Sequence, residues 1–155
     1  HCGDLECIGV LDHLQALAPV LAVRGYEDPF EAGERLANPT RVVTAGGLHI
    51  GMIHDIQWPG PHIKVGGSGT TLLFPPGEIH ETMTRKFGRP VDIVAFGDTH
   101  EELIAWHRGV LFVNPGSPTC PGLRHRRGDL GTVAILELAG ETVGVEIVKL
   151  GGDRL

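Results

Sequence analysis

The chain has 155 residues, enough for one domain that buries roughly two-thirds of the surface its unfolded form exposes. Its net charge of −6 argues against a general nucleic-acid binder, which needs a basic surface to release counterions from phosphates. The apolar runs are too short to cross a bilayer, and the three cysteines lack a disulfide-framework spacing. We therefore expect a cytoplasmic protein that does not enter a membrane.

The first third of the chain predicts helices and strands in alternation. Apolar residues at helical spacing predict a short amphipathic helix over 10–18, and a compact apolar run predicts a strand over 20–23. The segments 41–44 and 49–53 are rich in β-forming residues. The Gly46-Gly47 pair between them is typical of a tight hairpin turn.

Periodicity disappears over residues 55–77, which are rich in proline and glycine. An irregular segment of this length is usually either functional or disordered. Because it directly follows His54, we expect a flap over a crevice, with Trp58 or Phe74 as substrate contacts. A mobile surface loop or an oligomer contact is the alternative.

The middle of the chain returns to regular structure. A helix is predicted over 78–87, ended by Gly88, and a buried strand over 91–96. The segments 103–107 and 110–113 predict a hairpin.

A basic segment over 123–127 interrupts an otherwise acidic chain. It could contact phosphate, although such charge runs are more often solvated loops. Alternating residues over 132–138 and 142–150 then predict a terminal hairpin, with a turn at 139–141.

Metal-capable side chains follow several of the apolar runs. Asp98 and His100 come after Gly97 at the end of the strand predicted over 91–96. Asp4 follows Gly3, and His54 follows the strand predicted over 49–53. Functional sites in α/β proteins commonly lie at the carboxyl ends of the strands. Carboxylate and imidazole donors suit Mn, Fe, Zn or Ni better than calcium.

An ordered set of short motifs runs through the whole chain. They are Gly-Asp at 3–4, Val-x-Gly-x-x-Asp at 23–28, Ile-His at 53–54, Gly-x-Thr-His at 97–100 and Asn-Pro-Gly-Ser at 114–117. The set resembles the calcineurin-like metallophosphoesterases, in particular the small bacterial and archaeal phosphodiesterase branch.

This resemblance implies an α/β fold, a four-layer α/β/β/α sandwich, with a pair of divalent metal ions at the strand ends. Asp4 would bridge both ions, His54 would bind one and His100 the other, with Asp98 as a further ligand. The ions would be manganese, with iron, zinc or nickel as alternatives. A metal-bound hydroxide would then hydrolyse a small phosphate ester, with Asp4, His54 and His100 as the catalytic residues.

The chain also departs from the family pattern. The family opens with an Asp-x-His strand that residues 1–155 lack, so we expect a single domain that is truncated at its N-terminus. Tyr26 replaces the family's asparagine ligand, Asp98 replaces a histidine, and Asp55 follows His54 in place of glycine. Tyr26, Asp28 and Asp55 are then candidates for substitute or supporting ligands.

Two classes of function follow from the resemblance. The first is a metal-dependent phosphodiesterase, with the missing strand encoded upstream and weak or no activity in the 155-residue form. The second is a catalytically degenerate scaffold, because the retromer subunit of this fold looks like an enzyme but serves as a protein-interaction module. A homo-oligomer is compatible with both.

Overall fold

The computed structural model describes residues 1–140 and 142–151, so Glu141 of the predicted terminal turn lies outside the described residues. The elements, in chain order, are α1 (Ile8–Leu17), η1 (Phe30–Leu36), β1 (Thr40–Ala45), β2 (Leu48–Ile53), β3 (Lys64–Gly66), η2 (Gly67–Gly69), β4 (Thr71–Leu73), α2 (Ile79–Phe87), β5 (Ile93–Ala95), β6 (Glu102–His107), β7 (Val110–Pro115), β8 (Thr132–Ala139) and β9 (Thr142–Lys149).

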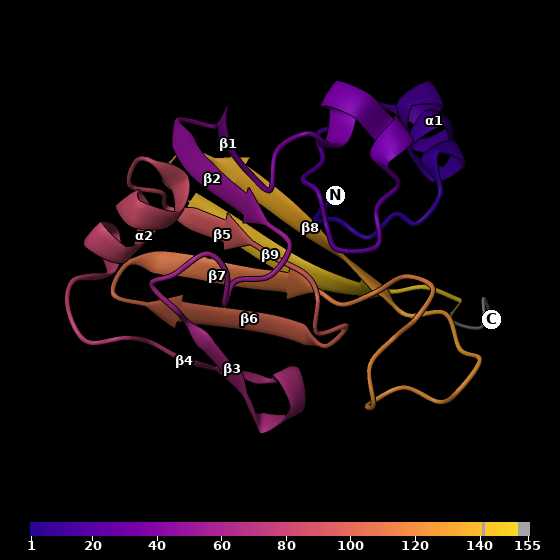
Figure 1. Cartoon of the computed structure of the whole chain (residues 1–155). Coiled ribbons are helices and arrows are strands. Elements are labelled where there is room, and N and C mark those ends of the chain that lie inside the picture. Colours follow the sequence, from indigo (N-terminus) through magenta and orange to yellow (C-terminus); the bar gives the residue numbers. More distant parts are fainter. Residues whose placement is uncertain (141, 152–155) are drawn as a thin grey trace.

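The central feature is a mixed five-stranded sheet with the order β1-β2-β5-β7-β6 (Figure 1). The three inner strands β2, β5 and β7 are parallel, with Val94 opposite Gly51 and Phe112. The two outer strands join by antiparallel hairpins. Parallel strands are buried on both faces, which is why β5 and β7 have almost continuous apolar sequences.

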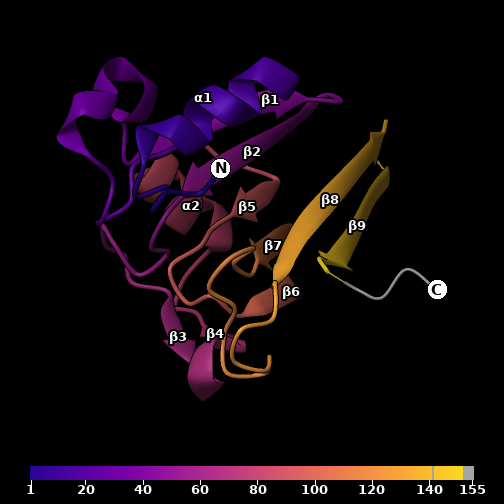
Figure 2. The same ribbon diagram turned by 90° about the vertical axis from the view of Figure 1, so that its right-hand side faces the viewer.

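The two faces of this sheet are covered differently. On one face Ile79 and Met83 of α2 pack against a buried cluster that includes Val94 and Phe96. On the other face the β8–β9 hairpin, a separate two-stranded sheet, packs over Leu111 and the neighbouring residues of β5 and β7. Figure 2 shows β8 and β9 standing apart from the main sheet as a layer of their own.

The N-terminal region forms a third cluster beside these layers. Leu11 of α1 packs with Ala22 and with Leu36 of η1, so α1 covers this region and not the β8–β9 hairpin. The predicted strand over 20–23 is wrong. The main-chain hydrogen bonds of this segment include only two to His1, from Val23 N–H and to Leu21 O, which is too few for a ladder.

The prediction of an irregular flap over 55–77 is also wrong in part. This segment contains the β3–β4 hairpin, whose η2 turn packs close to Thr99 and Glu101 at Gly69. Phe74 stacks on His107 with 3.7 Å between ring centroids and packs against the core, and it is not among the residues that line the pocket described below. Trp58 is exposed, and its role as a substrate contact stays a prediction.

The remaining predicted elements are confirmed with shifts of a few residues at their ends. The β1–β2 turn has Gly46 and Gly47 at positive φ, as a tight hairpin requires, and α2 ends at Gly88 in the left-handed conformation. Among the residues that the structure describes, no helix is both long and apolar enough to span a membrane.

Candidate functional site

The strand ends converge because the inner strands are parallel. His54 directly follows β2, and Gly97 follows β5, its parallel neighbour, so both leave the sheet at the same edge. The N–H of Gly97 donates to His54 O at 2.9 Å and ties the two strand ends together. Asp98 and His100 are therefore carried next to His54, as the sequence predicted.

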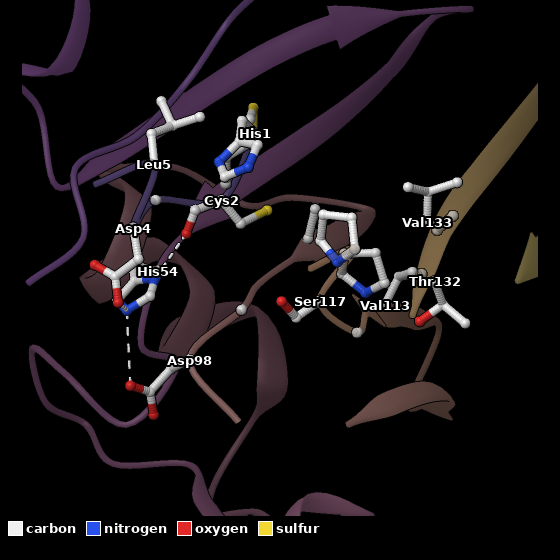
Figure 3. Close-up of a pocket in the computed structure, with 18 of the residues that line it drawn as sticks. His1, Cys2, Asp4, Leu5, His54, Asp98, Val113, Ser117, Thr132 and Val133 are labelled. Carbon is white, nitrogen blue, oxygen red and sulfur yellow. Dashed lines mark hydrogen bonds and ion pairs between the residues drawn. The ribbon is translucent and has the colours of Figure 1, made fainter. Parts of the chain in front are cut away.

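Asp4 reaches this edge from the N-terminal segment. Its Oδ2 lies 3.1 Å from Nε2 of His54, and Oδ1 of Asp98 lies 3.6 Å from the same nitrogen. Figure 3 shows both carboxylates turned toward the His54 ring. Asp4, His54, Asp98 and His100 all line one mostly apolar pocket of about 620 Å³. Asp4, His54 and Asp98 are thus direct neighbours, and His100 lines the same pocket.

The His54 ring has a defined orientation. Its Nδ1 lies 2.8 Å from Cys2 O, and because a carbonyl oxygen only accepts, Nδ1 must carry the proton. In the neutral ring, Nε2 then holds the lone pair. This Nε2 is buried without a hydrogen bond of acceptable geometry, although two carboxylates lie close to it. A buried polar atom of this kind calls for a cation or a proton between it and the carboxylates.

Three of the four predicted ligands have unusual backbone conformations. Asp4, Asp98 and His100 have φ of 54°, 69° and 61°, in the left-handed region that non-glycine residues rarely adopt. Such conformations persist only where the surroundings enforce them, and they gather at functional sites.

The local electrostatics favour a positive charge. Burial raises the pKa of the Asp98 carboxyl, and the negative charges of Asp55 and Asp4 raise it further, while His54 opposes the rise. Several carboxylates crowd one partly buried edge, so their repulsion would fall if a cation were bound.

The present side-chain positions do not form a complete coordination shell. Within residues 1–140 and 142–151, no three His, Cys, Asp or Glu side chains converge in a geometry suited to a metal ion. The donor types fit a divalent transition metal, as does the buried Nε2 of His54.

Tyr26 and Asp55 form a pair beside this group. The Tyr26 hydroxyl donates to Oδ2 of Asp55 at 2.9 Å, and the Tyr26 ring lies edge-on to His54. Burial, followed by the hydrogen bond and charge of Asp55, raises the pKa of Tyr26 to about 12. The phenol is therefore neutral at physiological pH, and neutral phenols bind metals weakly.

Two buried residues fix the loops that carry the ligands; the sequence named Asp28 as a candidate supporting or substitute ligand but assigned Asn114 no role. Asp28 accepts the backbone N–H groups of Asp4 and Leu5, which favours the supporting role over that of a substitute ligand. Asn114, at the end of β7, donates to Gly97 O at 2.9 Å and to Thr99 Oγ1 at 3.0 Å. Both residues lie in motifs quoted above, Val-x-Gly-x-x-Asp and Asn-Pro-Gly-Ser, which mark the residues but do not specify these contacts.

The basic segment over 123–127 has a structural task. Arg124 pairs with Glu101 at 2.8 Å and with Glu102 at 2.6 Å, and His125 contacts Glu102. These contacts close the loop onto the start of β6, while Arg126 and Arg127 stay exposed, and a phosphate contact of this segment stays a prediction.

Several known proteins are similar to this chain in sequence or in fold. A probable metallophosphoesterase of Methanothermobacter thermautotrophicus is 26% identical over 97% of this chain and 74% of its own length. A probable metallophosphoesterase of Methanocaldococcus jannaschii is 31% identical over 78% of this chain. The matched part of the chain spans only 53% of the length of that relative. The structure of Vps29 from Entamoeba histolytica complexed with Zn²⁺ has a TM-score of 0.58 at 24% identity, covering 91% of this chain and 75% of that one.

Each of these proteins matches most of the chain. Residues 1–141 match the family described as the calcineurin-like phosphoesterase superfamily domain. The chain belongs to the calcineurin-like phosphoesterase superfamily.

Proposed function

We propose that this protein is a metal-dependent phosphodiesterase that hydrolyses a small phosphate ester. The observation that carries the proposal is the buried Nε2 of His54, which faces the carboxylates of Asp4 and Asp98 without a hydrogen bond. A neutral imidazole with Nδ1–H bound to a carbonyl is the form in which histidine binds metals.

In this proposal Asp4, His54, Asp98 and His100 hold the metal, with two ions in the intact protein and manganese as the native metal. Iron, zinc and nickel are the alternatives that these oxygen and imidazole donors also suit. When bound, such ions polarise the phosphoryl oxygen and lower the pKa of water. The four-layer α/β/β/α sandwich expected from the resemblance is part of the same proposal.

The residues of this chain supply orientation and charge. The Cys2 carbonyl holds the His54 ring in one tautomer, and the pairing of β2 with β5 sets His54 beside Asp98. The pocket gives a phosphate ester a route to these side chains, and most of its lining is apolar.

The test combines metal binding and turnover. Chelator-stripped protein should bind Mn²⁺ by calorimetry, with weaker binding at a pH below about 6, where histidine ligands protonate. Hydrolysis of bis(p-nitrophenyl) phosphate by the intact protein with added Mn²⁺ should fall to background in Asp4→Ala and His54→Ala, whereas the 155-residue form should show weak or no turnover. A wild-type protein that binds no Mn²⁺, Zn²⁺, Fe²⁺ or Ni²⁺ at neutral pH would contradict the proposal.

A second candidate is a catalytically degenerate scaffold that binds another protein. It is favoured by the Tyr26–Asp55 hydrogen bond, because a neutral phenol stands where the family has an amide ligand. Metal binding without turnover of any common phosphoester would support this candidate over the enzyme.

A further inference from the structure

Asp28 is a buried carboxylate with an unusual set of partners. Only 6% of its surface is exposed, and its two oxygens accept three backbone N–H groups. Oδ2 accepts from Gly25 at 2.7 Å and from Asp4 at 3.0 Å, while Oδ1 accepts from Leu5 at 2.6 Å. The bonds from Asp4 and Leu5 bind the short segment around Asp4 to the segment 25–28, and the bond from Gly25 closes that second segment on itself.

These bonds hold Asp4 in a conformation that it would not adopt unaided. Asp4 has φ of 54°, and its N–H needs a partner in this partly buried turn. The approach is so close that a Cβ on Gly25 would lie 2.1 Å from Oδ1 of Asp4. Asp28 supplies the acceptor that makes this tight crossing of two chain segments favourable.

The conformation decides where the Asp4 carboxylate points. Oδ1 accepts the N–H of Glu27 at 2.8 Å, which leaves Oδ2 directed at Nε2 of His54, 3.1 Å away. The two carboxylates therefore have separate tasks. The oxygens of Asp28 are used by backbone amides, and one oxygen of Asp4 stays available to a cation.

We infer that Asp28 is a positioning residue, which aims the Asp4 carboxylate at a divalent metal ion. The inference rests on the proposed function, because Asp4 matters in this way only if the site binds a metal. It extends that proposal to a residue that contacts neither metal nor substrate and acts only through the backbone of Asp4, Leu5 and Gly25.

The chemistry of the carboxylate makes the inference testable with a nearly isosteric change. Asp28→Asn keeps one acceptor oxygen but turns the other position into an NH₂ donor, which would face a backbone N–H. At least one of the three bonds is then lost, and the Asp4 loop loosens. Asp92→Asn is the matched control, because Asp92 also accepts a backbone N–H, from His49 at 2.8 Å, at the far end of β2.

The experiment titrates chelator-stripped wild-type, Asp28→Asn and Asp92→Asn proteins with Co²⁺. The visible absorption of Co²⁺ reports its coordination, and calorimetry gives the affinity without any need for turnover. We expect Asp28→Asn to bind Co²⁺ roughly tenfold more weakly, with an altered spectrum, since supporting residues have effects of this size. Asp92→Asn should match the wild type within about twofold. Thermal unfolding without metal confirms that each protein is folded.

The outcomes separate the two proposals. Absence of Co²⁺ binding by the wild type contradicts the proposed metal site itself. Wild-type affinity and spectrum in Asp28→Asn overturn the positioning role while leaving the metal site intact. If Asp28→Asn does not fold, Asp28→Glu takes its place, because the longer side chain keeps the charge but shifts the Asp4 loop. The same loss is then expected, and unchanged Co²⁺ binding overturns the inference.

Discussion

The candidate site consists of two halves that the fold holds in different ways. The sheet-borne half comprises His54, Asp98 and His100, which follow the parallel strands β2 and β5. The loop-borne half comprises Asp4 and Tyr26, which lie in segments outside the five-stranded sheet.

The sheet-borne half is held by repeated backbone pairing and by the core beneath it. The loop-borne half depends on few contacts, chief among them the three hydrogen bonds to Asp28. Because a ladder distributes its stabilisation over many bonds, one change weakens it only locally, whereas one change can displace a loop entirely. The two halves should therefore respond differently to single substitutions, and four predictions follow this contrast from the largest effect to the smallest.

Gly25→Ala attacks the loop-borne half and should have the largest effect. The added Cβ would lie 2.1 Å from Oδ1 and 2.4 Å from N of Asp4, so the two segments must separate. We expect a loss of about 3 kcal/mol in the free energy of unfolding, measured with urea. Gly9→Ala is the control, since Gly9 is exposed in α1 and should gain about 0.5 to 1 kcal/mol. Equal changes in the free energy of unfolding for Gly25→Ala and Gly9→Ala would show that the segments around Gly25 and Asp4 have room for the added Cβ.

Asn114→Asp tests the sheet-borne half through a buried polar side chain that supports it. A carboxylate cannot donate to Gly97 O or to Thr99 Oγ1, as the Asn114 amide does, although it can still accept from Gly116 N. We expect urea unfolding to show a loss of about 2 kcal/mol. Asn38→Asp, at an exposed position, should change stability by less than about 0.5 kcal/mol. An Asn114→Asp variant with the stability of the wild type would mean that the backbone pairing of the strands alone holds the loop after β5.

Arg124→Ala tests the outer support of the sheet-borne half. It removes the partner of Glu101, which is only 2% exposed, and one partner of Glu102. A buried carboxylate that loses its partner is destabilising, and we expect a loss of about 1.5 kcal/mol in urea unfolding. Arg126→Ala, at an exposed neighbouring position, should have almost no effect. Similar values for both would indicate that the loop is held by its backbone alone.

Lys86→Met tests the sheet-borne half from the helix side and has the smallest expected effect. Lys86 of α2 is 4% exposed, donates to Pro59 O at 2.5 Å, and has its pKa lowered to about 8 by burial, against a partial rise from Asp55. At pH 7 both the folded and the unfolded chain hold the proton, so the burial cost of the charge is fully present. We expect Lys86→Met to be more stable there, by up to about 1 kcal/mol.

The pH dependence gives this last prediction its sign. Between pH 8 and 10.5 the folded wild-type chain releases the Lys86 proton before the unfolded chain does, so wild-type stability rises with pH. The advantage of Lys86→Met should therefore shrink over this range and vanish near its upper end. Urea unfolding of both proteins at pH 8 and at pH 10.5 gives this difference in the free energy of unfolding. A difference in favour of Lys86→Met that grows with pH would contradict the lowered pKa of Lys86.

Local chemistry was enough to predict much of the fold. The glycine pair between β1 and β2 and Arg108-Gly109 between β6 and β7 adopt positive φ, and these turns set the pairing of their strands. The helix α2 ends where Gly88 permits a left-handed cap. His54, Asp98 and His100 could be predicted at one site because the parallel strands β2 and β5 present their ends at one edge, whereas Asp4 reaches the site from a segment outside the sheet.

What the sequence by itself determined is therefore most of the elements and the chemistry at their ends. Only the tertiary structure decided which segments found partners: residues 20–23 have the composition of a strand but lack a ladder, while β3 and β4 pair within a segment without periodicity. The same holds for the supporting side chains. Asp28 acquires its task from backbone N–H groups 23 and 24 residues away, and no local pattern specifies a contact that depends on where two chain segments cross.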